Sequence, residues 1–383
     1  MKKNLLGWLA MATMLVGTGC SSDEVVNDYS PENAIQFGTY VGRDAQGRAS
    51  VIDDTNLGTL GFGVYAYYTD GASFNESSST PNFMRNQKVE KTIDGWVYDP
   101  LKYWPNESTD KLSFFAYAPY QGTGDAENNL TLSQITNGGI PKVVFSLNQD
   151  VEKQEDLLWA IPHLNVQKQN VNSDIKFALK HALSRIGFDA EVMVNEVNGD
   201  VTGAVNDAST QPAVGLDEKT TITINSVKIH ARFTNGTLNL MDGSWTIADG
   251  DKPSSAKTLV LGTSNFVENS NVFKSTDNNN KRKLNADDSY IMIVPQDFTD
   301  VENNGAVQIE VNYTVKTEDL SLATGSSEIT NNISDAFAIN FEQGKAYKFT
   351  LHLGMTSVKV SATVQTWNDL HEKNDIAVNV PLN

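Results

Sequence analysis

Alternation of apolar and polar residues with a period of two dominates the chain. It runs through short segments rich in β-branched and aromatic residues, at 62–68, 112–119, 221–230, 307–315 and 358–364. Asn, Asp, Gly and Ser residues separate these segments. The pattern is typical of antiparallel strands in β-sandwiches and predicts an all-β protein. The sequence has no regular alternation of strands with helices, so a parallel α/β sheet is not expected.

One segment, 175–188, fits two periodicities. A helix would place Ala178 and Ile186 on one face, whereas Ile175 and Phe177 alternate as they would in a strand. Because β-rich sequence flanks the segment on both sides, we predict two strands joined by a short connection. A first domain is expected to end near this connection.

The first residues have the pattern of an export signal. Lys2 and Lys3 precede an apolar run from Leu5 to Val16, and small residues follow it. The run is much shorter than the roughly 20 residues that a membrane-spanning helix needs. We therefore predict a signal peptide over residues 1–19.

Cys20 is the only cysteine in the 383 residues, and it follows this segment directly. The position predicts a bacterial lipoprotein, in which a peptidase cuts before Cys20 and the thiol carries a lipid. Acyl chains on one residue would anchor the protein to the outer membrane without a spanning helix. Residues 20–33 would then form an acidic, solvated tether. An ordinary secretory signal with an incidental cysteine is the alternative, since Gly17 stands where lipoproteins usually have leucine.

Charge and motif content argue against most chemical functions. The chain has 47 acidic and 29 basic residues, a net charge of −18 that repels phosphate backbones and disfavours nucleic-acid binding. The sequence contains no HExxH, His-x-His or GxSxG motif, so we predict no metal, cofactor or catalytic site. His181 lies between Leu179 and Leu183, where a structural role is expected. The five histidines are His163, His181, His230, His352 and His371.

Exposed tryptophans could bind sugar, which leaves a glycan-binding protein as an alternative. Each tryptophan of the mature sequence lies in or beside a strand-like segment, so packing in the core is the preferred interpretation. These residues are Trp96, Trp104, Trp159, Trp245 and Trp367.

Several short motifs follow one another over most of the chain. They lie at 95–96, 102–105, 114–119, 156–160, 177–188, 290–296, 344–347 and 358–367. Their order resembles the fimbrillin-like lipoproteins of Bacteroidetes, which are subunits of the type V pilus. The resemblance implies two tandem β-sandwich domains of transthyretin-like topology. We place these domains at residues 34–186 and 187–383.

The resemblance also implies a route of assembly. A trypsin-like protease cuts the exported precursor after an arginine near its N-terminus and releases the first strand. A strand from the next subunit then fills the exposed groove. Arg48, which Ala49 and Ser50 follow, resembles the cleavage arginine, and Arg43 is an upstream competitor.

The two strands that exchange can be placed in the same way. The displaced segment would carry Ile35, Phe37, Tyr40 and Val41. The donor strand would carry Ile376, Val378 and Val380, which share one face. Alternatively, the latter segment is an ordinary terminal strand of its own domain, as in subunits that receive a strand and donate none.

These features together predict a structural, adhesive pilus subunit that is not an enzyme. Its expected partners are other pilin subunits, a processing protease, the outer membrane and a ligand on a host or bacterial surface. A surface glycan-binding lipoprotein that is neither cleaved nor polymerised is the alternative.

Overall fold

The computed structural model of the protein describes most of the chain beyond the predicted tether. The described residues are 33–41, 52–54, 56–122, 130–132, 138–168, 174–194, 216–232, 234–247, 257–277, 280–286, 289–299, 306–366 and 376–378. The predicted sites at Cys20, Arg43, Arg48 and Val380, and also Trp367, lie outside these residues.

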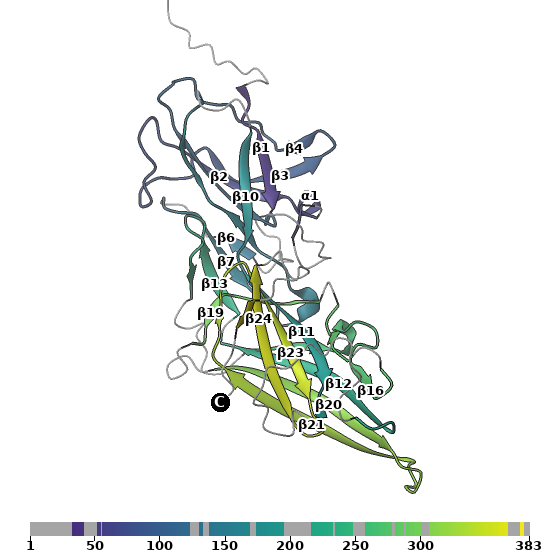
Figure 1. Cartoon of the computed structure of the whole chain (residues 1–383). Coiled ribbons are helices and arrows are strands. Elements are labelled where there is room, and N and C mark those ends of the chain that lie inside the picture. Colours follow the sequence, from purple (N-terminus) through teal and green to yellow (C-terminus); the bar gives the residue numbers. More distant parts are fainter. Residues whose placement is uncertain are drawn as a thin grey trace, which may run out of the picture.

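The protein is all-β, and its strands form several sheets in an elongated arrangement (Figure 1). The predicted fold class is therefore confirmed at this level, while the transthyretin-like topology of two tandem domains stays a prediction. The helical segments that lie wholly within the described residues are short: α1 (Leu57–Leu60) and the 3-10 turns Val151–Lys153 and Thr263–Asn265.

An eight-stranded sheet forms the N-terminal end of the molecule. Its order is β1 (Phe37–Val41), β10 (Ile175–His181), β8 (Leu158–Ala160), β5 (Leu112–Ala118), β2 (Phe62–Tyr68), β3 (Met84–Thr92) and β4 (Gly95–Val97), and β9 (His163–Val166) pairs with β5. β2 and β5 are apolar apart from Ser113, and all their residues except Tyr68 are buried, so both faces of the sheet are covered here.

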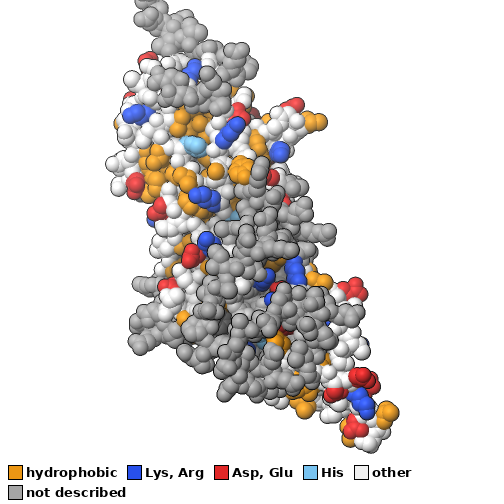
Figure 2. Space-filling view, in the orientation of Figure 1, with side chains coloured by type: hydrophobic (Ala, Val, Ile, Leu, Met, Phe, Trp, Pro, Cys, Tyr) orange, Lys and Arg blue, Asp and Glu red, His pale blue; other side chains and the backbone are white. Residues whose placement is uncertain are grey.

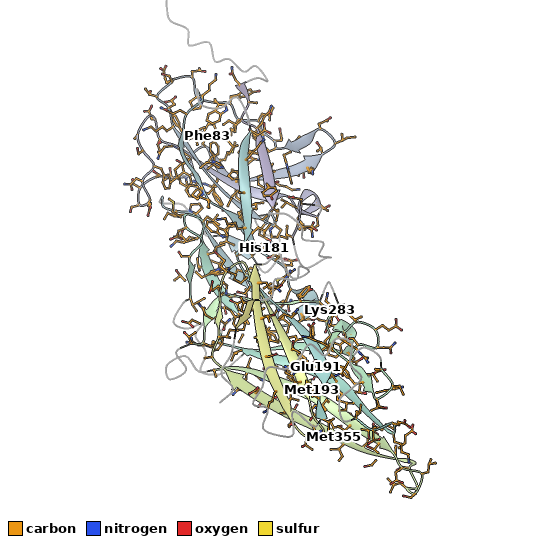
Figure 3. The ribbon with its side chains drawn as sticks, in the orientation of Figure 1. Phe83, His181, Glu191, Met193, Lys283 and Met355 are labelled. Atoms are coloured by element: carbon orange, nitrogen blue, oxygen red, sulfur yellow. The ribbon has the colours of Figure 1, made fainter. Side chains whose placement is uncertain are left out.

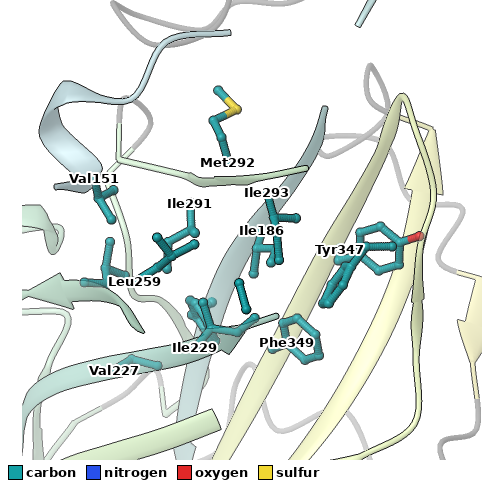
Figure 4. Packing of buried hydrophobic residues seen from close by; sticks show 14 of the residues in the cluster. Val151, Ile186, Val227, Ile229, Leu259, Ile291, Met292, Ile293, Tyr347 and Phe349 are labelled. Atoms are coloured by element: carbon teal, nitrogen blue, oxygen red, sulfur yellow. The ribbon is translucent and has the colours of Figure 1, made fainter. Parts of the chain in front are cut away.

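Two further sheets pack in the C-terminal half. The six-stranded sheet contains β17 (Arg282–Lys283), β11 (Ser184–Val192), β23 (Lys345–Leu353), β24 (Val358–Thr366), β25 (Ile376–Val378) and β18 (Ile291–Ile293). The five-stranded sheet contains β15 (Lys257–Gly262), β12 (Thr220–Ala231), β20 (Val307–Glu318), β21 (Ser326–Phe337) and β16 (Val272–Lys274). Their core includes Ile186, Ile229 and Phe349, which lie close together in Figure 4.

The remaining strands form two small sheets. A four-stranded sheet has the order β14 (Trp245–Thr246), β13 (Asn235–Asn239), β7 (Lys142–Ser146) and β6 (Leu130–Leu132). We call it the junction sheet, because β7 comes from the N-terminal half and β13 from the C-terminal half. β19 (Gln296–Asp297) and β22 (Asn340–Phe341) pair with each other.

The ambiguous segment 175–188 contains the whole of β10, in the N-terminal sheet, and the start of β11, in the six-stranded sheet. β10 ends at His181 and β11 begins at Ser184, so the predicted pair of strands with a short connection is confirmed. The predicted domain boundary after residue 186 falls within β11, which pairs with β23 over 185–192. The division into domains stays a prediction, and the junction sheet joins the two halves across it.

Two pairings differ from the antiparallel pattern that the sequence predicts. β1 pairs with β10 in parallel, and β11 pairs with β23 in parallel. In both cases a long stretch of chain separates the partners, which gives the connection room to cross from one end of the sheet to the other. A period of two is the same in both kinds of pairing, so it could not distinguish them.

Candidate functional site

The first strand, β1, lies at the edge of the eight-stranded sheet and is also part of its core. In the described residues it pairs with β10 alone, in the register Phe37 opposite Ile175 to Val41 opposite Leu179. The side chains of Ile35, Phe37 and Val41 are buried, whereas Tyr40 is 49% exposed. The predicted alternation of this segment therefore has a clear inner face, with Tyr40 on the outer one.

Phe37 is the centre of an aromatic cluster. Its ring centroid lies 5.3 Å from that of Tyr98, 5.9 Å from that of Phe114 and 5.8 Å from that of Phe177. Tilted, edge-on and stacked rings at these distances are favourable beyond the area that they bury. β1 therefore contributes a large side chain that the rest of the sheet surrounds.

The residues just before β1 are hydrogen-bonded to the segment 98–104, on the side away from β10. The backbone N–H of Ile35 donates to the carbonyl oxygen of Lys102 at 2.8 Å, and the Tyr98 hydroxyl donates to the carbonyl oxygen of Ile35 at 2.8 Å. The N–H of Trp104 donates to the carbonyl of Asn33 at 3.0 Å. Loss of the segment would leave buried polar groups without partners as well as an apolar groove.

The Tyr98 hydroxyl makes this anchor sensitive to alkaline pH. Burial raises its pKa from the ordinary value near 10 to about 12. The folded protein therefore holds the proton more tightly than the unfolded chain, and the resulting stability is complete below pH 10 and lost as the pH rises through 12. From pH 9 to 12 we expect this group to remove about 2–3 kcal/mol from the free energy of unfolding.

Urea unfolding of the wild type and of Tyr98→Phe at pH 9 and pH 11.5 checks this prediction. The phenylalanine variant loses the hydrogen bond at every pH, so it should be less stable at pH 9. The difference in the free energy of unfolding between the two proteins should be smaller at pH 11.5. If this difference is the same at both pH values, the Tyr98 hydroxyl does not titrate in this way.

Both candidate cleavage arginines lie between two anchored positions. On one side the N–H of Val41 donates to Asp54 Oδ1 at 2.9 Å. On the other side Ile52 is buried, and its N–H donates to Asp156 Oδ2 at 3.1 Å. Arg43 and Arg48 are within the interval 42–51 that separates these anchors, outside the described residues.

Asp156 also explains the histidine that the sequence assigned to a structural role. His181 Nδ1 lies 2.7 Å from Asp156 Oδ2, and both side chains are buried. Asp156 Oδ1 accepts a further bond from the N–H of Leu157 at 2.8 Å. Figure 3 shows His181 where the two halves meet, so this buried pair holds the end of β10 at the junction. The structural interpretation of His181 is confirmed.

The contact of a second buried histidine, His352, could not be predicted from the sequence. His352 Nδ1 lies 2.6 Å from Glu191 Oε1, and His352 Nε2 lies 2.9 Å from Ser361 Oγ. The three residues are on β11, β23 and β24, and Glu191 stands opposite His352 in the parallel register. Only the register brings them together, and no sequence motif indicated the contact.

The remaining expectations concern metals, membranes and tryptophans. Among the described residues, no group of three or more His, Cys, Asp or Glu side chains could hold a metal ion, and no helix is long and apolar enough to cross a membrane. Trp104 and Trp159 are buried, and Trp96 packs edge-on against Phe62 at 5.0 Å. Trp245 Nε1 donates to the carbonyl of Ala182 at 2.9 Å. These four side chains therefore have packing roles, as predicted.

The candidate donor strand lies within its own chain in this structure. β25 pairs with β24 in antiparallel register, with Val378 opposite Ala362 and Ile376 opposite Val364. This placement matches the alternative that the segment is a terminal strand of its own domain. Its donation to another subunit stays a prediction.

Comparison with known proteins places this architecture among fimbrial proteins. The chain is 25% identical over 380 residues to the fimbrium subunit Fim1C of Phocaeicola vulgatus, an alignment that covers 96% of this chain and 97% of that protein. Its fold is similar to the crystal structure of a fimbrial protein from Bacteroides vulgatus, with a TM-score of 0.66, 20% identity and coverage of 87% of this chain and 99% of that one. The Fimbrillin-like family model matches residues 48–367. The match spans most of the sequence, so the chain belongs to the fimbrillin-like family, as the order of its motifs predicted.

Proposed function

We propose that this protein is a subunit of a type V fimbrium that proteolysis activates for strand exchange. It is a structural protein, as its family indicates, rather than an enzyme. The observation that carries the proposal is the placement of β1. This strand fills an apolar groove at a sheet edge, and the candidate arginines lie directly after it.

Delivery and activation would use the same short N-terminal region. A lipid on Cys20 would hold the precursor on the outer membrane and present it at the cell surface. A trypsin-like protease would then cut after Arg48 or Arg43, which separates β1 and the lipid anchor from the rest of the chain. The mature subunit would begin at Ala49 or Asp44.

The physical basis of assembly would be strand addition. Loss of β1 exposes the unpaired backbone groups of β10 and the apolar groove, which is an unfavourable state. A strand from another subunit restores the hydrogen bonds and fills the alternate side-chain pockets. Because donor and acceptor are different surfaces, the contact is heterologous and builds an open filament.

The segment with Ile376, Val378 and Val380 is the donor candidate of this chain. β25 has three residues and lies at the end of its sheet, so few backbone hydrogen bonds hold it there. Its release would cost less than the release of a central strand. If it stays in place, the protein would receive a strand and donate none, as expected of a subunit at the end of a fibre.

Exposed apolar surface supports an association with other molecules. Figure 2 shows hydrophobic side chains gathered on the visible face of the N-terminal half, and the exposed large side chains include Leu101, Ile161 and Leu164. Such surfaces commonly mark contacts between proteins. In a fimbrium they would contact the neighbouring subunit or a ligand on a host or bacterial cell.

Limited trypsin treatment of the full chain tests the proposal. We expect a cut after Arg48 or Arg43, identified by mass spectrometry, with the β-sheet circular dichroism of the remainder retained and multimers in size-exclusion chromatography. A cleaved protein that remains monomeric under all conditions would count against polymerisation. The glycan-binding alternative predicts an uncleaved monomer that binds immobilised glycans.

A further inference from the structure

The groove that β1 occupies is shaped for an aromatic side chain. We propose that it selects a donor strand from a different fimbrial protein, one that places phenylalanine where Phe37 now lies. This inference rests on the proposed strand exchange and names the partner that the exchange would use. The consequence is that the segment 376–382 of this chain fills its own groove less completely than a strand with phenylalanine would.

The size of the pocket is fixed by the rings around it. Phe177 also contacts Phe62, with ring centroids 6.0 Å apart, and His163, at 5.5 Å. Phe114 contacts Trp104 at 6.0 Å. Phe177 and Phe114 are therefore each supported by a further ring, and the Tyr98 hydroxyl accepts a hydrogen bond from the N–H of Lys102 at 3.3 Å. These walls have little room to move in and fill a void. A smaller occupant would leave a cavity, and cavities in such surroundings are strongly unfavourable.

The other inward positions of β1 are less selective. Ile35 and Val41 are fully buried aliphatic residues, and Thr39, opposite Phe177, is half-buried. The outward side chains of Gln36 and Tyr40 are exposed and impose no requirement. The groove therefore accepts an aliphatic residue at position 35, an aromatic residue at 37, a small residue at 39 and an aliphatic residue at 41.

The segment 376–382 has no aromatic residue at any position of this pattern. Its alternating apolar side chains are Ile376, Val378, Val380 and Leu382. In every register that turns these side chains inward, an aliphatic side chain, or none, would enter the aromatic pocket. Identical copies could still assemble through this strand when no other donor is present. A donor strand with phenylalanine would displace it, so mixed assembly is favoured over assembly of identical copies.

Peptide binding to the cleaved protein tests this selectivity. The full chain is cut with trypsin, the first-strand peptide is removed in mild denaturant, and the refolded acceptor is titrated with labelled peptides. The reference peptide covers residues 33–43. We expect Phe37→Ala in this peptide to weaken binding about 100-fold or more, which corresponds to the usual cost of removing a buried phenylalanine. Tyr40→Ala, at the exposed position, should change the affinity less than about threefold.

The peptide 374–383 is then compared with its Ile376→Phe, Val378→Phe and Val380→Phe variants, which together cover the alternative registers. We expect the native peptide to bind more weakly than the reference peptide, and one of the variants to bind about tenfold more tightly than the native peptide or better. Native binding as tight as that of the reference peptide, with no gain from any phenylalanine, would overturn the selectivity and leave strand exchange intact. Failure of the reference peptide itself to bind would overturn the proposed strand exchange.

Discussion

An Arg43→Ala, Arg48→Ala double variant is expected to remain monomeric where the trypsin-treated wild type forms multimers. In the uncut chain β1 is tethered to its own groove, so its effective concentration there is about millimolar. A donor strand on another subunit, at micromolar concentration, would need a roughly 1,000-fold higher affinity for the groove to displace it. Cleavage removes the tether, and the released strand can then diffuse away after it dissociates.

The matched control is the Arg43→Lys, Arg48→Lys variant. Trypsin cuts after lysine, so this variant should be cleaved and should assemble like the wild type, whereas an arginine-specific protease should leave it monomeric. The two single alanine variants would show which arginine is used. Assembly of the double alanine variant at the wild-type rate, measured by size-exclusion chromatography, would contradict activation by cleavage at these sites.

A Gly243→Ala variant is expected to lose about 3–5 kcal/mol of the free energy of unfolding. Gly243 has φ +74°, and a Cβ at this position would lie 2.1 Å from Trp159 Cζ2. Trp159 is 5% exposed, so its ring has little room to move. Gly243 also lies next to the junction sheet, where its carbonyl accepts a bond from Gln343 Nε2 at 2.9 Å. The clash would therefore push apart the two halves that the junction sheet connects.

Gly325→Ala separates the clash from the backbone strain. Gly325 has nearly the same φ, +70°, but a Cβ there would have no neighbour within 4 Å. The Gly325→Ala variant should lose only the free energy needed to hold an alanine in the left-handed backbone conformation, about 1–2 kcal/mol of the free energy of unfolding. Urea unfolding of both variants measures the difference. Equal losses would show that the Trp159 ring moves aside without cost and that the junction is looser than we infer.

The alternating pattern was sufficient to identify the strands whose two faces have different surroundings. β10 is an example, since its side chains alternate between buried and exposed along the whole strand. The junction sheet could not be predicted, because its strands have two to five residues and Val144 pairs with Thr237, far away in the sequence. Periodicity reports which way a side chain points, and it carries no information on which strand lies beside another.

The candidate site shows the same limit. The sequence indicated the alternating residues Ile35, Phe37 and Val41, because their spacing is local. It did not indicate the rings that enclose Phe37, which come from three separate strands or loops. The contact between Glu191 and His352 was invisible for the same reason, since the parallel register of β11 and β23 creates it. Local residues could be predicted, and their partners needed the structure.

The N-terminal residue of the subunit in fimbriae sheared from intact cells tests the central claim most directly. Mass spectrometry or Edman sequencing of these fibres should find Ala49, or Asp44 if Arg43 is the site. The first strand and Cys20 would then be absent from the assembled protein. Fibres in which every copy of the subunit begins at a lipid-modified Cys20 would contradict the proposal that release of β1 opens the groove.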